Sequence, residues 1–149
     1  MKNLDKVRIV KVGILGDNNF SDFKKIERIL NTFIKKYKIQ NLNDYFKNEI
    51  DTRFEFVIGR DNKLQKIIED FSKKNNFNYE IINEVKNDNL NIGTFKRDAK
   101  IWETCHIGLF IAEFAKLEKN NDFSMKILTK LKRKVLLFDY KLNKYKYIH

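Results

Sequence analysis

The sequence has no proline and one cysteine, Cys105, among its 149 residues. A single cysteine cannot form an internal disulfide or a zinc site built from several thiolates. No apolar run approaches the roughly 20 residues that a transmembrane helix needs. Residues 1–10 lack the apolar segment and cleavage site of a secretory signal. We therefore expect a cytoplasmic protein that makes no membrane contact.

The length and the apolar content favour a single folded domain over residues 1–149. Hydrophobic residues make up 42% of the chain and aromatic residues 13%, which excludes a disordered chain. No internal repeat and no linker rich in Gly, Ser or Pro divides the sequence. One domain with a substantial core is the simplest organisation.

The net charge of +11 is the strongest imbalance in the composition. It is compatible with a nucleic-acid partner. Of the 31 basic residues, however, 25 are Lys, which makes weaker bidentate contacts with phosphate than Arg. The abundance of Asn, Ile, Phe and Lys matches AT-rich codons, as in a phage or a low-GC bacterium. We favour a solvated basic surface, and the nucleic-acid alternative stays open.

Apolar strands and amphipathic helices alternate along the sequence. Apolar runs predict five strands, over residues 7–15, 54–58, 79–82, 107–112 and 135–138. Apolar residues at a spacing of three and four predict helices over 23–37, 64–71, 94–105 and 123–131. Residues 84–93 are polar and predict a loop. Residues 40–52 predict an insertion, and 141–149 form a tail.

This alternation predicts an α/β fold. A single Rossmann-like domain, with a mostly parallel five-stranded sheet and helices on both faces, is the most economical topology. The tail interleaves aromatic residues with lysines, which is compatible with an edge strand, a packed tail or a surface for single-stranded nucleic acid.

Three glycine-containing segments fall where such a fold binds ligands. In open α/β sheets, ligands bind beyond the carboxyl ends of the strands, at the point where the strand order reverses. Each segment precedes a helix whose N-terminus would attract phosphate or carboxylate. Ordinary turns and helix capping explain any one of them, and their agreement in position favours a site. The candidate residues are Gly16, Asp17, Asn18, Asn19 and Phe20; Gly59, Arg60 and Asp61; and Gly93, Lys96, Arg97 and Asp98.

The first segment, GDNNFSDF at residues 16–23, resembles the G-S-R-D-F-T-D-Y opening of the SLOG superfamily (Smf/DprA and LOG-like proteins), in the branch near YspA and YpsA. Residues 54–59 fall where that family has a strand and a glycine-rich loop. Residues 93–98 resemble its G-P-x-x-R-N segment, and 107–111 its A-D-x-x-I-A-F strand. The resemblance implies a Rossmann-like fold with a pocket for a nucleotide or a nucleotide-derived ligand.

Two departures from the family pattern limit what the resemblance implies. Asn18 stands in place of the arginine of the first motif, and Gly59 is the only glycine of the second loop. The P-G-G-x-G-T-x-x-E segment of LOG enzymes is absent, so their phosphoribohydrolase activity is not implied. In the expected pocket, Arg97 would neutralise phosphate, helped by Arg60 or Lys96, and Asp17 or Asp61 would bind hydroxyl groups.

Catalytic candidates are few. Cleavage of an N-glycosidic bond would need a carboxylate near the ribose, which Glu113 or Asp17 could supply. A solvated or capping role for Glu113 is the simpler interpretation. Cys105 and His106 are adjacent and would point in different directions, which argues against a nucleophile pair. No metal motif is present, and we expect no cofactor.

Three functions therefore stay open at this point. The preferred one is binding of a nucleotide-derived ligand, as a sensor, a sequestering protein or a degenerate family member. The second is a hydrolase resembling nucleotide N-glycosidases. The third is a basic module that contacts nucleic acid or protein, and a homo-oligomer is compatible with all three.

Overall fold

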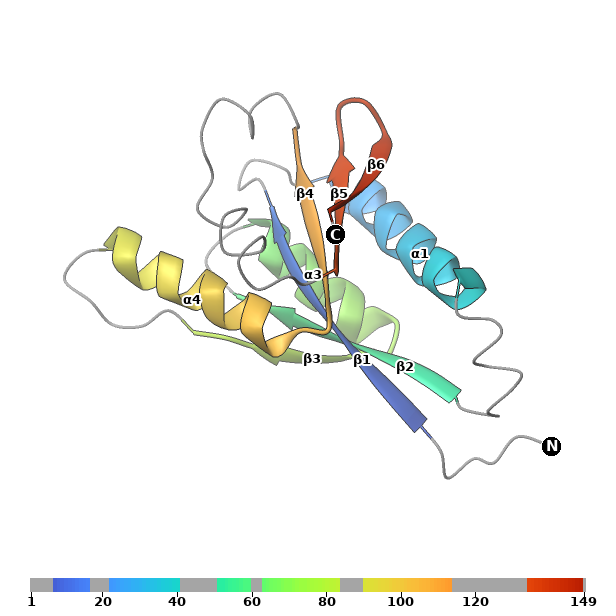
Figure 1. Cartoon of the computed structure of the whole chain (residues 1–149), viewed down its shortest axis with the longest axis horizontal. Helices are drawn as coiled ribbons and strands as arrows, with labels where there is room; N and C mark the ends of the chain where they lie inside the picture. The colour runs from blue at the N-terminus through green and yellow to red at the C-terminus, as the bar shows by residue number, and fades with distance from the viewer. Residues whose placement is uncertain are drawn as a thin grey trace.

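The computed structural model describes residues 7–16, 22–40, 51–59, 63–83, 90–113 and 134–148, and these residues form a sheet with helices against it (Figure 1). None of the helices described there is long and apolar enough to cross a membrane. The elements, in chain order, are β1 (Val7–Gly16), α1 (Phe23–Gln40), β2 (Asp51–Ile58), α3 (Lys63–Lys74), β3 (Asn78–Ile81), α4 (Leu90–Thr104), β4 (Ile107–Ala112), β5 (Lys134–Asp139) and β6 (Lys144–Ile148).

The sheet has the strand order β3-β2-β1-β4-β5-β6. All neighbouring strands are parallel except β6, which pairs antiparallel with β5. The first strand, β1, lies near the centre of the sheet. The next two strands, β2 and β3, follow on one side of β1, and β4 lies on the other side. This arrangement is a Rossmann-like α/β fold, as the alternation of elements predicts.

Among the described residues the sheet has six strands, rather than the expected five. The sixth, β6, comes from the tail 141–149, which folds back on β5 as a hairpin. Its lysines, Lys144 and Lys146, alternate with tyrosines, so the segment has no continuous apolar run that would mark a strand. Lysines on an outer strand also discourage pairing with another sheet, which suits the position of β6 at the edge.

Helices cover both faces of the sheet because consecutive side chains of its inner strands are apolar and point to opposite faces. Against one face pack α1 and α3, and against the other packs α4. Each face of the sheet therefore has its own hydrophobic cluster. The helix residues buried in the cluster under α1 and α3 are Ile26, Ile29, Leu30, Phe33, Leu64, Ile68 and Phe71. Those buried in the cluster under α4 are Ile101, Trp102 and Cys105.

The second face is packed closely by α4 because the sheet carries two glycines there. A Cβ on Gly13 would lie 2.9 Å from the Sγ of Cys105, and one on Gly108 would lie 2.8 Å from the Trp102 ring. Trp102 has no exposed surface. It is therefore a core residue.

Several boundaries differ from the sequence-based prediction. The helix α4 begins at Leu90, so Gly93 lies inside a helix and not in a loop over 84–93. One glycine costs a helix about 1 kcal/mol, which does not end a helix of 15 residues. The expected insertion at 40–52 is shorter, because α1 runs to Gln40 and Asp51 pairs with Val7. The remainder of that insertion and the predicted helix 123–131 lie outside the described residues.

Candidate functional site at the carboxyl edge of the sheet

The carboxyl ends of the parallel strands meet at one edge of the sheet. There β1 ends at Gly16, β2 is followed by Gly59, β4 is followed by Glu113, and β5 ends at Asp139. The strand order reverses between β1 and β4, which pair directly, with Gly16 opposite Ile111. Gly16 and Glu113 therefore flank the switch point at which sheets of this class bind ligands.

Gly16 is held in a tight contact between protein elements. A Cβ at this position would overlap the backbone carbonyl of Ile111 and would lie 2.8 Å from Cδ2 of Leu64 on α3. No described glycine has a positive φ, so a left-handed turn is not the reason for this glycine. Close approach of β1, β4 and α3 alone requires glycine here, whether or not a ligand also approaches.

Gln65 joins the ends of β1 and β2. Its side chain is fully buried on the first turn of α3. The backbone N–H of Gly59 donates a hydrogen bond to Oε1 of Gln65 (2.7 Å), and Nε2 of Gln65 donates to the carbonyl of Ile14 (3.0 Å). One amide thus satisfies a donor and an acceptor of two neighbouring strands and fixes how they end.

Arg97 lies against Gly59, which brings together two of the three predicted segments. A Cβ on Gly59 would lie 2.6 Å from Nη1 of Arg97, so the guanidinium occupies the space that a side chain would fill. Arg97 is 2% exposed, and its Nε donates to Oδ1 of Asp98 at 2.7 Å. The carboxylate balances the buried charge, which would otherwise be costly to remove from water.

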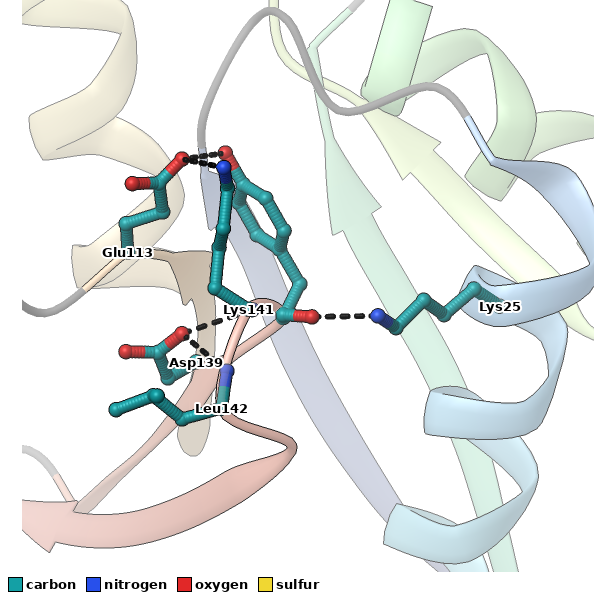
Figure 2. Close-up of polar contacts among 6 residues, drawn as sticks. Lys25, Glu113, Asp139, Lys141 and Leu142 are labelled. Carbon is teal, nitrogen blue, oxygen red and sulfur yellow. Dashed lines mark hydrogen bonds and ion pairs between the residues drawn. The ribbon is translucent and has the colours of Figure 1, made fainter.

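Glu113, at the end of β4, is held by the β5–β6 hairpin (Figure 2). The hydroxyl of Tyr140 donates to Oε1 of Glu113 at 2.9 Å, and Nζ of Lys141 lies 3.8 Å from the same oxygen. The Glu113 side chain is 16% exposed. Its carboxylate therefore has a fixed position at the switch point and still reaches the surface.

Asp139 organises the turn that carries these partners of Glu113. Its Oδ1 accepts hydrogen bonds from the backbone N–H groups of Lys141 (2.9 Å) and Leu142 (3.0 Å), as Figure 2 shows. The ammonium of Lys25, on α1, donates to the carbonyl of Tyr140 from the other side. The hairpin is thus joined both to β4 and to α1.

The remaining predicted site residues fall into two groups. Lys96 is exposed on α4, and Gly93 lies in the same helix near its start. The other predicted site residues lie outside the described residues: Asp17, Asn18, Asn19, Phe20, Arg60 and Asp61.

Within the described residues no cluster of His, Cys, Asp and Glu could hold a metal ion.

Cys105 and His106 point to different partners, as expected. The buried Sγ of Cys105 donates to the carbonyl of Trp102 at 3.3 Å. The exposed ring of His106 accepts a hydrogen bond from the backbone N–H of Lys11 through Nδ1 at 2.9 Å. Neither group activates the other, so this pair offers no nucleophile.

Sequence reasoning missed Gln65, Asp139 and the role of Tyr140. A signal for Gln65 was present, because Gln65, Glu69 and Ser72 recur at helical spacing beside the apolar stripe of α3, and all three are buried. Asp139 directly follows the fifth predicted strand, at the same edge as Glu113. The contact between Tyr140 and Glu113 spans 27 positions and leaves no local pattern.

No protein-family model matches the chain, and no curated protein sequence matches it. A solved structure of a protein of unknown function from Vibrio parahaemolyticus is similar to it at 10% identity, covering 97% of this chain and 88% of that one, with a TM-score of 0.38. The candidate site accordingly rests on its own geometry.

Proposed function

We propose that the protein binds a nucleotide-derived small molecule at the carboxyl edge of its sheet. The observation that carries the proposal is the reversal of strand order between β1 and β4, because open α/β sheets bind ligands at that point. Gly16 and Glu113 flank it. The resemblance of residues 16–23 to the SLOG opening motif supports the same class of ligand.

In this proposal Arg97, which is paired with Asp98, contributes part of the positive potential at a phosphate site. Its guanidinium is buried against Gly59, so it acts as a fixed charge beneath the edge rather than as an exposed arm. A buried charge is screened less by salt than a surface lysine such as Lys96. Asp17 or Asp61 would accept hydrogen bonds from ribose hydroxyl groups, and Arg60 would add charge.

The test is a thermal-shift and calorimetric screen with mono-, di- and cyclic nucleotides and ADP-ribose, at low and moderate salt. A ligand at one hundred times its Kd stabilises a protein by about 2.7 kcal/mol, which raises the Tm of a domain of this size by about 5–10 °C. The informative variants are Arg97→Met, which removes the charge, and Arg97→Lys, which keeps it. Lys96→Met is the exposed control on the same helix.

The proposal predicts a salt-tolerant shift that Arg97→Met loses and that Arg97→Lys and Lys96→Met retain. Circular dichroism establishes that each variant is folded. A shift that survives Arg97→Met would contradict the assignment of the phosphate site. No shift with any nucleotide would contradict the proposal itself. Binding of oligonucleotides alone, lost as salt rises, would instead favour the basic interaction module.

A second candidate function rests on the position of Glu113. A carboxylate held at the switch point by Tyr140 could assist cleavage of an N-glycosidic bond, with Asp17 as the other candidate. The hydrolase alternative predicts slow release of free base from a nucleotide. Glu113→Gln would abolish that release, and Glu103→Gln, an exposed change on α4, would not. Unchanged release in Glu113→Gln would rule out this role.

A further inference from the structure

The two neighbours of β1 differ in length, and this leaves part of β1 without a partner on one side. On one side β1 pairs with β2 from Val7 onward, whereas on the other β4 begins opposite Val12. Figure 1 shows the first part of β1 extending with β2 beyond the other strands. In the described ranges, no strand pairs with residues 7–11 on the side of β4.

The ladder between β1 and β4 ends at a contact with His106. The N–H of Lys11 donates to Nδ1 of His106 (2.9 Å), and the carbonyl of Lys11 accepts from the backbone N–H of His106 (2.8 Å). Backbone groups alternate in direction along a strand, so Ile9 directs its N–H and carbonyl toward the same side as Lys11. There they extend past the start of β4.

The side chain at this open edge is apolar and exposed. Ile9 is 51% exposed, whereas its neighbour Val10 is 4% exposed and faces α1 and α3. Unpaired backbone groups beside an exposed apolar side chain form a template for an added strand. We call residues 7–10, on the side that β4 does not reach, the β1 edge.

The charged residues nearest to Ile9 are basic. Arg8 precedes Ile9 in the strand, and Arg53 is the residue of β2 paired with Ile9. Farther along, Lys11 is paired with Glu55 of β2 and lies 3.6 Å from the carboxylate of Glu80. Because the whole chain carries a net charge of +11, a second copy at this edge would meet like charge, and an acidic segment would meet opposite charge.

We propose that the β1 edge binds an extended, acidic peptide segment of another protein as an additional strand. The backbone of the segment would pair with the N–H and carbonyl of Ile9, and an apolar side chain of the segment would pack on Ile9. The acidic side chains on either side of it would point to the opposite face, where Arg8 lies. This surface lies at the beginning of β1, separate from the proposed ligand site at its carboxyl end.

The test uses the whole chain and two short acetylated peptides. In one peptide Glu and Val alternate, and in the other Lys replaces every Glu. Ile9→Pro removes the N–H that points away from β2, while Arg8 and Val10 keep their ladder with β2, since proline is tolerated where an edge N–H faces outward. Ile9→Thr is the matched control, because it keeps that N–H and favours strands.

The proposal predicts that the acidic peptide binds at least about tenfold more tightly than the basic one, and that Ile9→Pro weakens it by a similar factor. Ile9→Thr retains most of the affinity. In hydrogen-exchange measurements the amide of Ile9 becomes protected when the acidic peptide binds, and the amides of Gly16 and Gly59 do not change. Circular dichroism and the Tm establish that Ile9→Pro is folded.

Three results of the peptide experiments would overturn the proposal. They are no binding of the acidic peptide, equal binding of both peptides, and protection confined to sites away from Ile9. Self-association in analytical ultracentrifugation that Ile9→Pro abolishes would also overturn it, because a second copy would then occupy the edge. A nucleotide-binding defect in Arg97→Met leaves all of these outcomes unchanged, so the two proposals fail separately.

Discussion

The carboxyl edge of the sheet consists of two parts that are built differently. Around Gly16 and Gly59 the contacts are buried, and a glutamine amide and backbone groups make most of them. Around Glu113 the contacts are made by a hairpin with charged, partly exposed side chains. The comparison indicates that the first part is packed so that it stabilises the edge, whereas the second carries side chains that reach the surface of the edge.

The largest effect expected in the buried part is that of Gly16→Ala. The new methyl group would overlap the carbonyl of Ile111 and press on Leu64, so β1 and β4 would have to separate. Overpacking of this kind costs about 3 kcal/mol of unfolding free energy or more when backbone must move. Urea denaturation measures it. A loss below about 1 kcal/mol would show that the contact relaxes easily.

Gln65→Leu should have the next largest effect. It keeps the apolar bulk but leaves the N–H of Gly59 and the carbonyl of Ile14 without their partner. An unsatisfied buried group costs about 1–3 kcal/mol, so we expect a loss of about 2–3 kcal/mol and faster exchange of the Gly59 amide. Lys66→Leu, on the exposed side of the same turn, is the control. Equal losses in both variants would contradict the role of the amide.

Tyr140→Phe should affect stability much less. It removes the hydrogen bond to Glu113 and keeps the ring, and a partly exposed pair of this kind contributes about 1 kcal/mol or less. If the comparison is right, the variant changes nucleotide affinity more than it changes the unfolding free energy. Denaturation and calorimetry on the same preparation separate the two. A loss as large as that of Gln65→Leu would remove the distinction between the two parts.

The smallest effect concerns the pH dependence of the hairpin. Burial raises the pKa of Tyr145, which packs on Phe138 at a ring distance of 4.5 Å, and a hydrogen bond to Thr32 opposes the shift. Because the folded state holds the phenol proton of Tyr145 more tightly than the unfolded chain does, the contribution of Tyr145 to the unfolding free energy is fully present below the unfolded-state pKa near 10. This contribution is lost as pH rises through the folded-state pKa. Tyr145→Phe should therefore flatten the stability profile above about pH 10. An unchanged profile would contradict this assignment.

How far the sequence predicts this molecule follows from the range of each interaction. The strands β1 and β4 were predicted closely, because β4 and the second half of β1 are buried on both faces and their apolar runs are continuous. The strand β6 and the start of α4 were not, because β6 is polar at alternate positions and Gly93 weakens the helical pattern. The local sequence pattern does not show that β6 pairs with β5 or that α4 packs on the sheet.

The sequence predicted which residues lie at the carboxyl edge of the sheet, but not how these residues contact one another. Gly59 and Arg97 were both named from the sequence, yet their contact joins residues 38 positions apart and has no local signature. The packing that requires Gly16 depends on Ile111 and Leu64, which belong to other elements. Gly16 and Gly59 lie at the ends of β1 and β2, as the sequence predicts, although close packing rather than a left-handed turn accounts for them.

The most direct test of the central claim is an amide NMR titration of the whole chain with the nucleotide that gives the largest salt-tolerant thermal shift. The account predicts shifts at Gly16, Gly59 and Glu113, around the switch point, and none at Ile9. Shifts spread over exposed lysines such as Lys66 and Lys100, with Gly16 and Gly59 unmoved, would contradict a ligand site at the carboxyl edge.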